Sequence, residues 1–184
     1  MRIIRDTQFI DPADRGAAAA IGNFDGVHLG HQAVIDIARK EAEKSGAPLG
    51  IMTFEPHPRS FFGRVDVPFR LMNAEAKARQ MEKLGVEKLY EVPFNKALAA
   101  LTPEEFAQEI IHNRLGLKHV VVGEDFCFGK GRAGTVTDLQ AFGAQMGFGL
   151  TIAPMVEIGV GEVSSTSIRD ALTDGRPRDA TAML

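Results

Sequence analysis

The feature that most constrains the fold is an alternation of short apolar runs with helical patterns along the chain. The predicted strands are residues 17–21, 49–54, 86–92, 119–122 and 150–156. The predicted helices are residues 30–44, 73–84, 103–115 and 135–146, each closely followed by a glycine, and a last short helix from residue 166 or 167 to residue 173. Such alternation is typical of a parallel sheet covered on both faces. We therefore expect an α/β fold with a Rossmann-like, doubly wound parallel sheet of five strands.

Composition narrows the class of protein. A chain of 184 residues with 45% hydrophobic and 24% charged residues is typical of one globular domain. The formal net charge of -3 argues against a general nucleic-acid binder, which normally carries a basic face. The single cysteine, Cys127, allows no internal disulfide and suits a reducing compartment. With no visible signal peptide or membrane-length apolar stretch, we expect a cytoplasmic protein without a membrane or nucleic-acid partner.

The segment GNFDGVHLGH, residues 22–31, lies between the first predicted strand and the first predicted helix. Ligands bind outside the carboxyl ends of the strands in open parallel sheets. Glycines such as Gly22 and Gly30 let a phosphate approach the backbone, and a helix N-terminus favours negative charge. His28 and His31 can each donate a hydrogen bond to phosphate oxygens. The alternative is that both histidines are capping or surface residues of a glycine-rich turn; the spacing favours phosphate binding.

A second candidate phosphate motif is VSSTSIRDAL, residues 163–172. It offers hydroxyl groups and backbone donors at a helix start, followed one turn later by Arg169, whose planar guanidinium suits phosphate. The alternative is an ordinary helix cap in which Ser167 and Asp170 form a capping box. The presence of the first motif favours the phosphate interpretation.

Four segments together carry a resemblance to a known family. GNFDGVHLGH resembles the first signature of the HIGH-motif nucleotidylyltransferases, in the form used by bacterial FAD synthetases. Further segments resemble its other motifs: MTFEPHPRSFF (52–62), VGEDFCFGKGRAGT (122–135) and SSTSIR (164–169). The resemblance covers nearly the whole chain. It implies a sheet of the HIGH-motif nucleotidylyltransferase type, and a domain that joins FMN and ATP to give FAD and pyrophosphate with Mg²⁺.

Members of the family usually carry a C-terminal riboflavin kinase domain with a Pro-Thr-Ala-Asn signature. That signature does not occur in these 184 residues, so we expect residues 1–184 to be the FMN adenylyltransferase domain. Cys127 stands where relatives often have arginine, which leaves the role of that position open. Two other functions remain: a HIGH-motif nucleotidylyltransferase for another phosphorylated acceptor, or a flavin- or nucleotide-binding module without turnover.

The resemblance and the residue chemistry together assign roles to individual side chains. The predicted catalytic residues, which face the phosphates, are His28, His31, Asn23 and Arg169. The predicted ATP-binding residues are Gly22, Phe24, Asp25, Gly30, Ser164, Ser165 and Thr166. The predicted flavin-binding residues, from two long polar loops, are Pro56, His57, Pro58, Phe62, Asp125 and Phe128. No protein ligand is assigned to Mg²⁺, which we expect to bind with the ATP phosphates.

Overall fold

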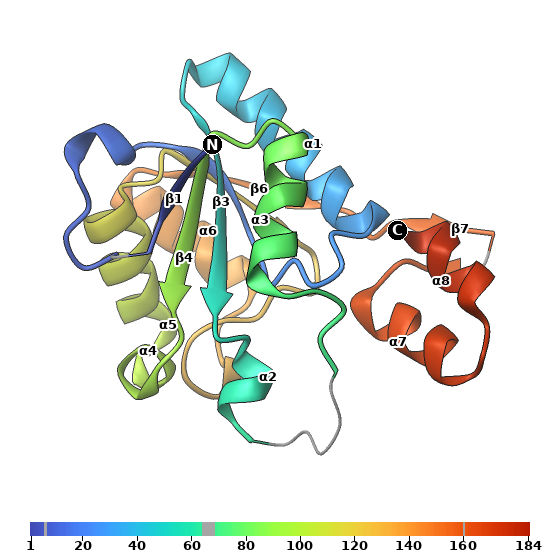
Figure 1. Cartoon of the computed structure of the whole chain (residues 1–184). Helices are drawn as coiled ribbons and strands as arrows, with labels where there is room; N and C mark the ends of the chain where they lie inside the picture. Colours follow the sequence, from blue (N-terminus) through green and yellow to red (C-terminus); the bar gives the residue numbers. More distant parts are fainter. Residues whose placement is uncertain (6, 64–68, 160) are drawn as a thin grey trace.

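A six-stranded parallel sheet forms the centre of the protein in a computed structural model, which describes residues 1–5, 7–63, 69–159 and 161–184 (Figure 1). Part of the predicted loop 55–70 lies outside the described residues. The strands are β1 (Arg2–Ile4), β2 (Ala18–Ile21), β3 (Leu49–Glu55), β4 (Lys88–Pro93), β5 (His119–Gly123) and β6 (Gly149–Ala153), in the spatial order β1-β4-β3-β2-β5-β6. The predicted fold class is confirmed.

The sheet has one strand more than the five predicted. β1 pairs in parallel with β4, with Arg2 opposite Lys88 and Ile4 opposite Tyr90. A three-residue segment is too short to show a periodic pattern, so its strand character comes from this pairing with a distant part of the chain.

Helices cover both faces of the sheet. The long helices are α1 (Leu29–Ser45), α3 (Ala74–Lys83), α6 (Val136–Met146) and the continuous pair α5 (Pro103–Glu105) and η2 (Phe106–Leu115), of which η2 is a π-helix. Shorter helices are η1 (Pro12–Asp14), α2 (Pro58–Phe61), α4 (Lys96–Ala100), η3 (Lys130–Arg132), α7 (Ser165–Thr173) and α8 (Pro177–Met183). The sequence predicted α7 but not the other short ones, which are only three to seven residues long and therefore show little periodic pattern.

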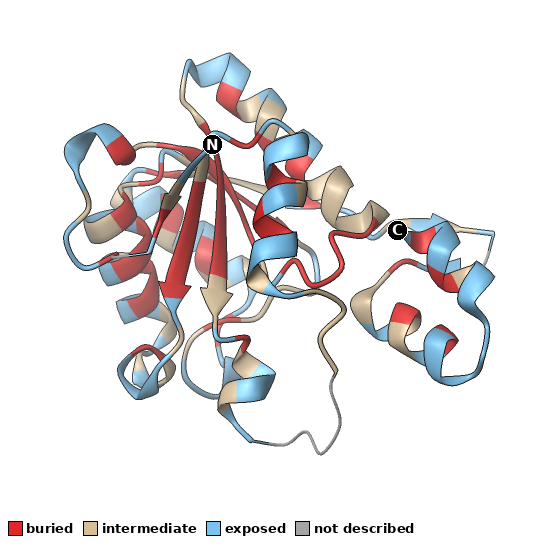
Figure 2. Ribbon diagram, in the orientation of Figure 1, coloured by how far each residue is buried: buried red, intermediate tan, exposed pale blue. Residues whose placement is uncertain are grey.

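Successive residues of β2 pack into opposite halves of the core, which defines the doubly wound arrangement. Ala19 and Ile21 pack with side chains of η2 and α6, whereas Ala18 and Ala20 pack with side chains of α1 and α3. All four β2 residues are buried, as expected for a parallel strand covered on both faces. Figure 2 shows that buried residues, in red, run along β4 and most of β3, whereas exposed residues, in pale blue, lie on the outer sides of the helices. Because β2 lies between β3 and β5, the loops after β2 and β5 meet at the point where the strand order reverses.

The C-terminal segment forms a small separate cluster beside the start of α1 (Figure 1). It contains a two-stranded hairpin of β7 (Glu157–Ile158) and β8 (Gly161–Glu162), followed by α7 and α8. Its buried residues include Val163, Ile168 and Met183, and Leu29 of α1 packs against them. This cluster therefore brings the second predicted phosphate motif next to the first. Within the ranges that the structure describes, no helix is long and apolar enough to cross a membrane.

Candidate active site

A cleft of about 990 Å³ opens at the carboxyl ends of the central strands. Ligands bind at this place in open parallel sheets. One wall is the loop after β2 with the start of α1, and it contributes Gly22, Asn23, Phe24, Gly30 and His31. The aromatic wall consists of Phe54, Phe62, Phe94, Phe106, Phe126 and Phe128. The cleft thus combines a glycine-containing backbone, suited to phosphate, with apolar rings, suited to a planar ligand.

The loop after β2 has a strained backbone. Phe24 (φ 51°) and Val27 (φ 44°) lie in the left-handed region, which costs a residue with a side chain on the order of 1–2 kcal/mol. Both side chains are only 1% exposed, so their packing offsets the strain. Strain of this kind persists only where the surrounding structure holds it, and it is concentrated at functional sites.

His28 and His31 form a stacked pair at the start of α1. Their ring centroids are 3.5 Å apart, and the ring planes differ by 20°. His28 is the N-cap residue of α1, and its Nδ1 accepts a hydrogen bond of 3.3 Å from the backbone N–H of His31. A neutral imidazole that accepts at Nδ1 carries its proton on Nε2. The capping and phosphate-binding interpretations are therefore compatible, because one ring nitrogen caps the helix and the other is a donor.

Burial keeps both imidazoles neutral near pH 7. It lowers the pKa of His28 to about 4, although the carboxylate of Asp25 opposes the shift. Burial, followed by the neighbouring His28 and Lys77, holds the pKa of His31 well below its usual range. His31 lines the cleft, and His28 is stacked against it. The pair can therefore supply N–H donors without carrying a charge.

The helix α7 begins with a serine cap. Ser164 lines the cleft, and its Oγ accepts a hydrogen bond of 3.0 Å from the backbone N–H of Ser167. The N-cap residue is therefore Ser164 and not Ser167, which was predicted to form a capping box with Asp170. The helix begins earlier than predicted. Thr166 is exposed and is not part of the cleft lining.

Asp25 connects the loop after β2 to α7. Its carboxylate, 3% exposed, accepts hydrogen bonds from the backbone N–H groups of residues 71–72 and forms an ion pair with Arg169. Arg169 Nε also donates to the carbonyl of Phe69 at 2.7 Å, and Ser165 Oγ donates to the carbonyl of Asp25 at 2.8 Å. In this structure these side chains hold α7 against the loop and are not part of the cleft lining. Their contacts with ATP stay a prediction.

The predicted flavin-binding residues divide into two groups. Those that line the cleft are Pro58, Phe62, Asp125 and Phe128; those that do not are Pro56 and His57. Phe62 is 57% exposed, whereas Phe128 is 5% exposed and stacks on Phe126 at 5.6 Å. His57 is buried behind the wall, where its Nδ1 caps α2 and its ring packs on Phe69. Long-range packing, which no local pattern reveals, turns His57 away from the cleft lining.

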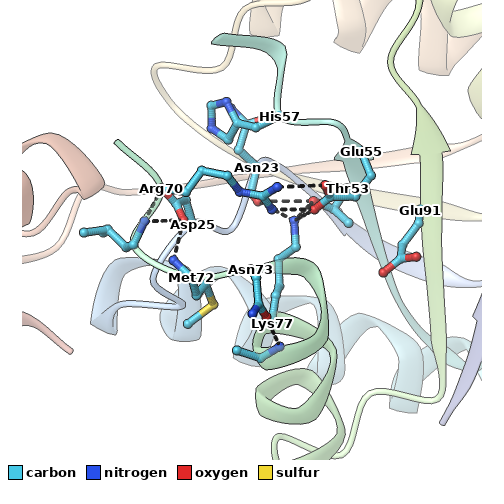
Figure 3. A network of polar contacts seen from close by, with 12 residues as sticks. Asn23, Asp25, Thr53, Glu55, His57, Arg70, Met72, Asn73, Lys77 and Glu91 are labelled. Atoms are coloured by element: carbon cyan, nitrogen blue, oxygen red, sulfur yellow. Dashed lines mark hydrogen bonds and ion pairs between the residues drawn. The ribbon is translucent and has the colours of Figure 1, made fainter. Parts of the chain in front are cut away.

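A buried ionic network beside the loop after β2 was not predicted from the sequence (Figure 3). Lys77 Nζ lies 2.9 Å from Glu55 Oε1, 3.1 Å from Thr53 Oγ1 and 3.3 Å from the carbonyl oxygen of Asn23. The Arg70 guanidinium donates hydrogen bonds to both carboxylate oxygens of Glu55, at 2.8 and 3.1 Å. One signal could have revealed it: Lys77 precedes Met81 by one helical turn on the buried stripe of α3. A lysine in such a stripe needs a buried partner.

The sheet order and the position of the cleft define a doubly wound α/β protein with its cleft at the carboxyl ends of the strands. Pantothenate synthetase from Thermus thermophilus has the same fold, with a TM-score of 0.59 over 100% of this chain and 82% of that one, at 14% identity. A crystal structure of a Streptococcus pneumoniae protein, described as a macrolide-efflux protein, superposes with a TM-score of 0.84 at 30% identity, over 98% of this chain and 60% of that one.

The chain belongs to the FAD synthetase family, whose model matches residues 10–167. Two curated relatives are named bifunctional riboflavin kinase/FMN adenylyltransferase. The one from Pseudomonas fluorescens is 40% identical over 94% of this chain and 55% of its own length. The one from Escherichia coli K12 is 36% identical over 100% of this chain and 59% of its own length. The chain thus spans little more than half the length of these relatives.

Proposed function

We propose that this chain is an FMN adenylyltransferase that transfers AMP from ATP to FMN, giving FAD and pyrophosphate, and that residues 1–184 form the adenylyltransferase domain. Membership of the FAD synthetase family supports the reaction. The observation that carries the proposal is the composition of the cleft. A phosphate-type loop with a histidine pair faces an aromatic wall that suits an isoalloxazine ring.

The reaction needs no protein nucleophile. A phosphate oxygen of FMN, already anionic, attacks the α-phosphorus of ATP and forms the new P–O bond. The bond from the α-phosphorus to the bridging oxygen breaks, and pyrophosphate leaves with the electron pair. Catalysis then consists of holding the two phosphates in line and stabilising the charge that develops on their oxygens.

The donors of the loop suit this task. Neutral His31, which lines the cleft, and His28 stacked against it would donate N–H groups to the phosphate oxygens. Asn23, exposed beside them, would orient a phosphate. Ser164 would complete the phosphate side from α7, and Arg169 would join it after leaving Asp25.

We assign the binding of FMN, the acceptor, to the two polar loops that follow β3 and β5. We infer that Phe62 and Phe128 contact the isoalloxazine ring, with Pro58 and Asp125 at its edge. His57 and Pro56 would then support the loop from outside the cleft lining.

Mg²⁺, which would neutralise phosphate charge, fits this cleft as an ion held mainly by ATP. Asp125 and Glu162 are the carboxylates among the described lining residues. One or two carboxylates together with substrate phosphates are a usual ligand set for this ion. Because Asp125 is assigned to the acceptor, Glu162 would be the protein contact of the ion.

The test is product analysis by chromatography after incubation with FMN, ATP and Mg²⁺. Formation of FAD and pyrophosphate in equal amounts supports the proposal. Turnover only with another phosphorylated acceptor would favour a different nucleotidylyltransferase. Binding of FMN and ATP without any turnover would favour a regulatory binding module.

We also propose a cytoplasmic location and small-molecule partners only, since Cys127 is a free cysteine and the net charge is -3. Fractionation of cells that express the tagged full-length protein, with a nucleic-acid binding assay, tests both points. In the relatives, the fusion partner is a riboflavin kinase, as their names state.

A further inference from the structure

The side chain of Lys77 is a buried cation for which the reaction described above has no direct use. It is 2% exposed and lies on α3, on the same stripe as Ala78 and Met81. Burying an ammonium group is costly unless it is paired, and an apolar residue of similar length would suit this stripe better. Packing alone therefore does not explain why a lysine occupies this position.

All three donors of the ammonium group have acceptors. They are the Glu55 carboxylate at 2.9 Å, the Thr53 hydroxyl at 3.1 Å and the Asn23 carbonyl at 3.3 Å. These acceptors come from the end of β3 and from the loop after β2 (Figure 3). Lys77 thus joins two segments from a third, α3.

The contact with Asn23 acts on the strained part of the loop. The Asn23 carbonyl accepts a second hydrogen bond of 3.1 Å from Thr53 Oγ1. Two hydrogen bonds therefore fix the peptide group between Asn23 and Phe24. Phe24 is the residue with φ 51°, and its ring centroid lies 5.0 Å from that of His31. A shift of this peptide group would therefore move both Asn23 and the ring that packs on His31.

The contact with Glu55 acts on the other side of the cleft. Glu55 ends β3 and directly precedes the segment that carries Pro58 and Phe62, both of which line the cleft. Arg70, from the far end of the same loop, donates to both oxygens of this carboxylate. Lys77 is thus in contact with the supports of both walls.

We propose that Lys77 is a positioning residue, which couples the loop after β2 to the loop after β3 and so fixes the histidine pair and Asn23 relative to the acceptor. The proposal rests on the adenylyltransferase function proposed above. The proximity of the ammonium group to His31, whose pKa it helps to lower, agrees with this placement.

The test compares Lys77→Met with Lys83→Met, an identical change at an exposed position of the same helix. We expect Lys77→Met to slow single-turnover FAD formation about 10- to 100-fold, because small displacements of reacting groups have effects of this size. The KM values for FMN and ATP should stay within about threefold, since Lys77 touches neither substrate. Lys83→Met should react like the unchanged protein.

A second variant and a spectroscopic readout guard against simple misfolding. Thr53→Val removes the other donor to Asn23 and should slow the reaction in the same direction, by less. The imidazole NMR signals of His31 should shift in Lys77→Met and not in Lys83→Met. Folded Lys77→Met with an unchanged single-turnover rate would overturn the inference. If Lys77→Met does not fold, an unchanged rate in Thr53→Val would overturn it.

The two proposals can fail separately. If the unchanged protein makes no FAD, the adenylyltransferase function is wrong, and the His31 signals alone then decide whether Lys77 positions the loop. If the unchanged protein makes FAD while both variants react normally, the function stands and the positioning role is wrong.

Discussion

Lowering the pH from 7 to 4 should destabilise the protein through two buried histidines, His28 and His57. Each is 5% exposed, and burial lowers the pKa of each to about 4, with Asp25 opposing the shift. In the unfolded chain both imidazoles titrate near 6.5. Between pH 6.5 and 4 the unfolded state therefore binds more protons than the folded state. The free energy of unfolding should fall as the pH falls through this window, and the stabilisation should be complete above it.

The magnitude follows from the two pKa values of each group. A pKa that falls from 6.5 to about 4 corresponds to about 3 kcal/mol per histidine, since one unit is worth about 1.4 kcal/mol. Neither ring is among the causes of the other's shift, so the two contributions add to about 6 kcal/mol. This is a large part of the roughly 5–15 kcal/mol that stabilises a typical domain.

The assay is urea unfolding at several pH values from 4 to 8, with His57→Asn as the main variant. His57 Nδ1 caps α2 by accepting a hydrogen bond from the backbone N–H of Arg59 at 3.1 Å. Asparagine is a good N-cap residue, so the variant keeps the cap and loses the titrating ring. We expect it to lose about 3 kcal/mol less than the unchanged protein between pH 7 and 4. His112→Asn, at an exposed position, is the matched control and should leave the profile unchanged.

The result that would refute this reasoning is an equal loss of stability in His57→Asn and in the unchanged protein. It would mean that the His57 ring is protonated in the folded state at the same pH as in the unfolded chain. A rise in stability on acidification would contradict the sign of the effect as well.

Three further predictions concern the cleft and its supports. His28→Ala and His31→Ala should each lower single-turnover FAD formation by about 10²–10³-fold while the protein stays folded, and near-normal rates would make the pair structural. Phe62→Ala should raise the KM for FMN more than the KM for ATP, because the ring is exposed on the acceptor wall; equal effects on both would contradict its assignment. Asp25→Asn should lower the free energy of unfolding by about 3 kcal/mol, because Arg169 would lose its buried counter-ion, and chemical denaturation that shows less than about 1 kcal/mol would rule this out.

The starts and ends of the long helices were predictable because they depend on residues only a few positions apart. Thr102 Oγ1 caps its helix by accepting a hydrogen bond of 3.2 Å from the backbone N–H of Glu105, and the Glu105 carboxylate accepts one of 2.8 Å from the backbone N–H of Thr102. Gly116, in the left-handed region at φ 56°, ends the same helix. Both features are visible in the sequence as a capping box and a terminal glycine.

The sequence by itself determined the α/β class and the succession of five strands and the long helices along the chain, since apolar periodicity and capping residues are local properties of the chain. Only the tertiary structure decided the partners of the polar side chains. Asp25 meets Arg169 across 144 residues, and Lys77 meets Asn23 across 54. Burial makes such pairings necessary, because a charge removed from water must find a partner, but the partner is selected by the packing of the whole fold.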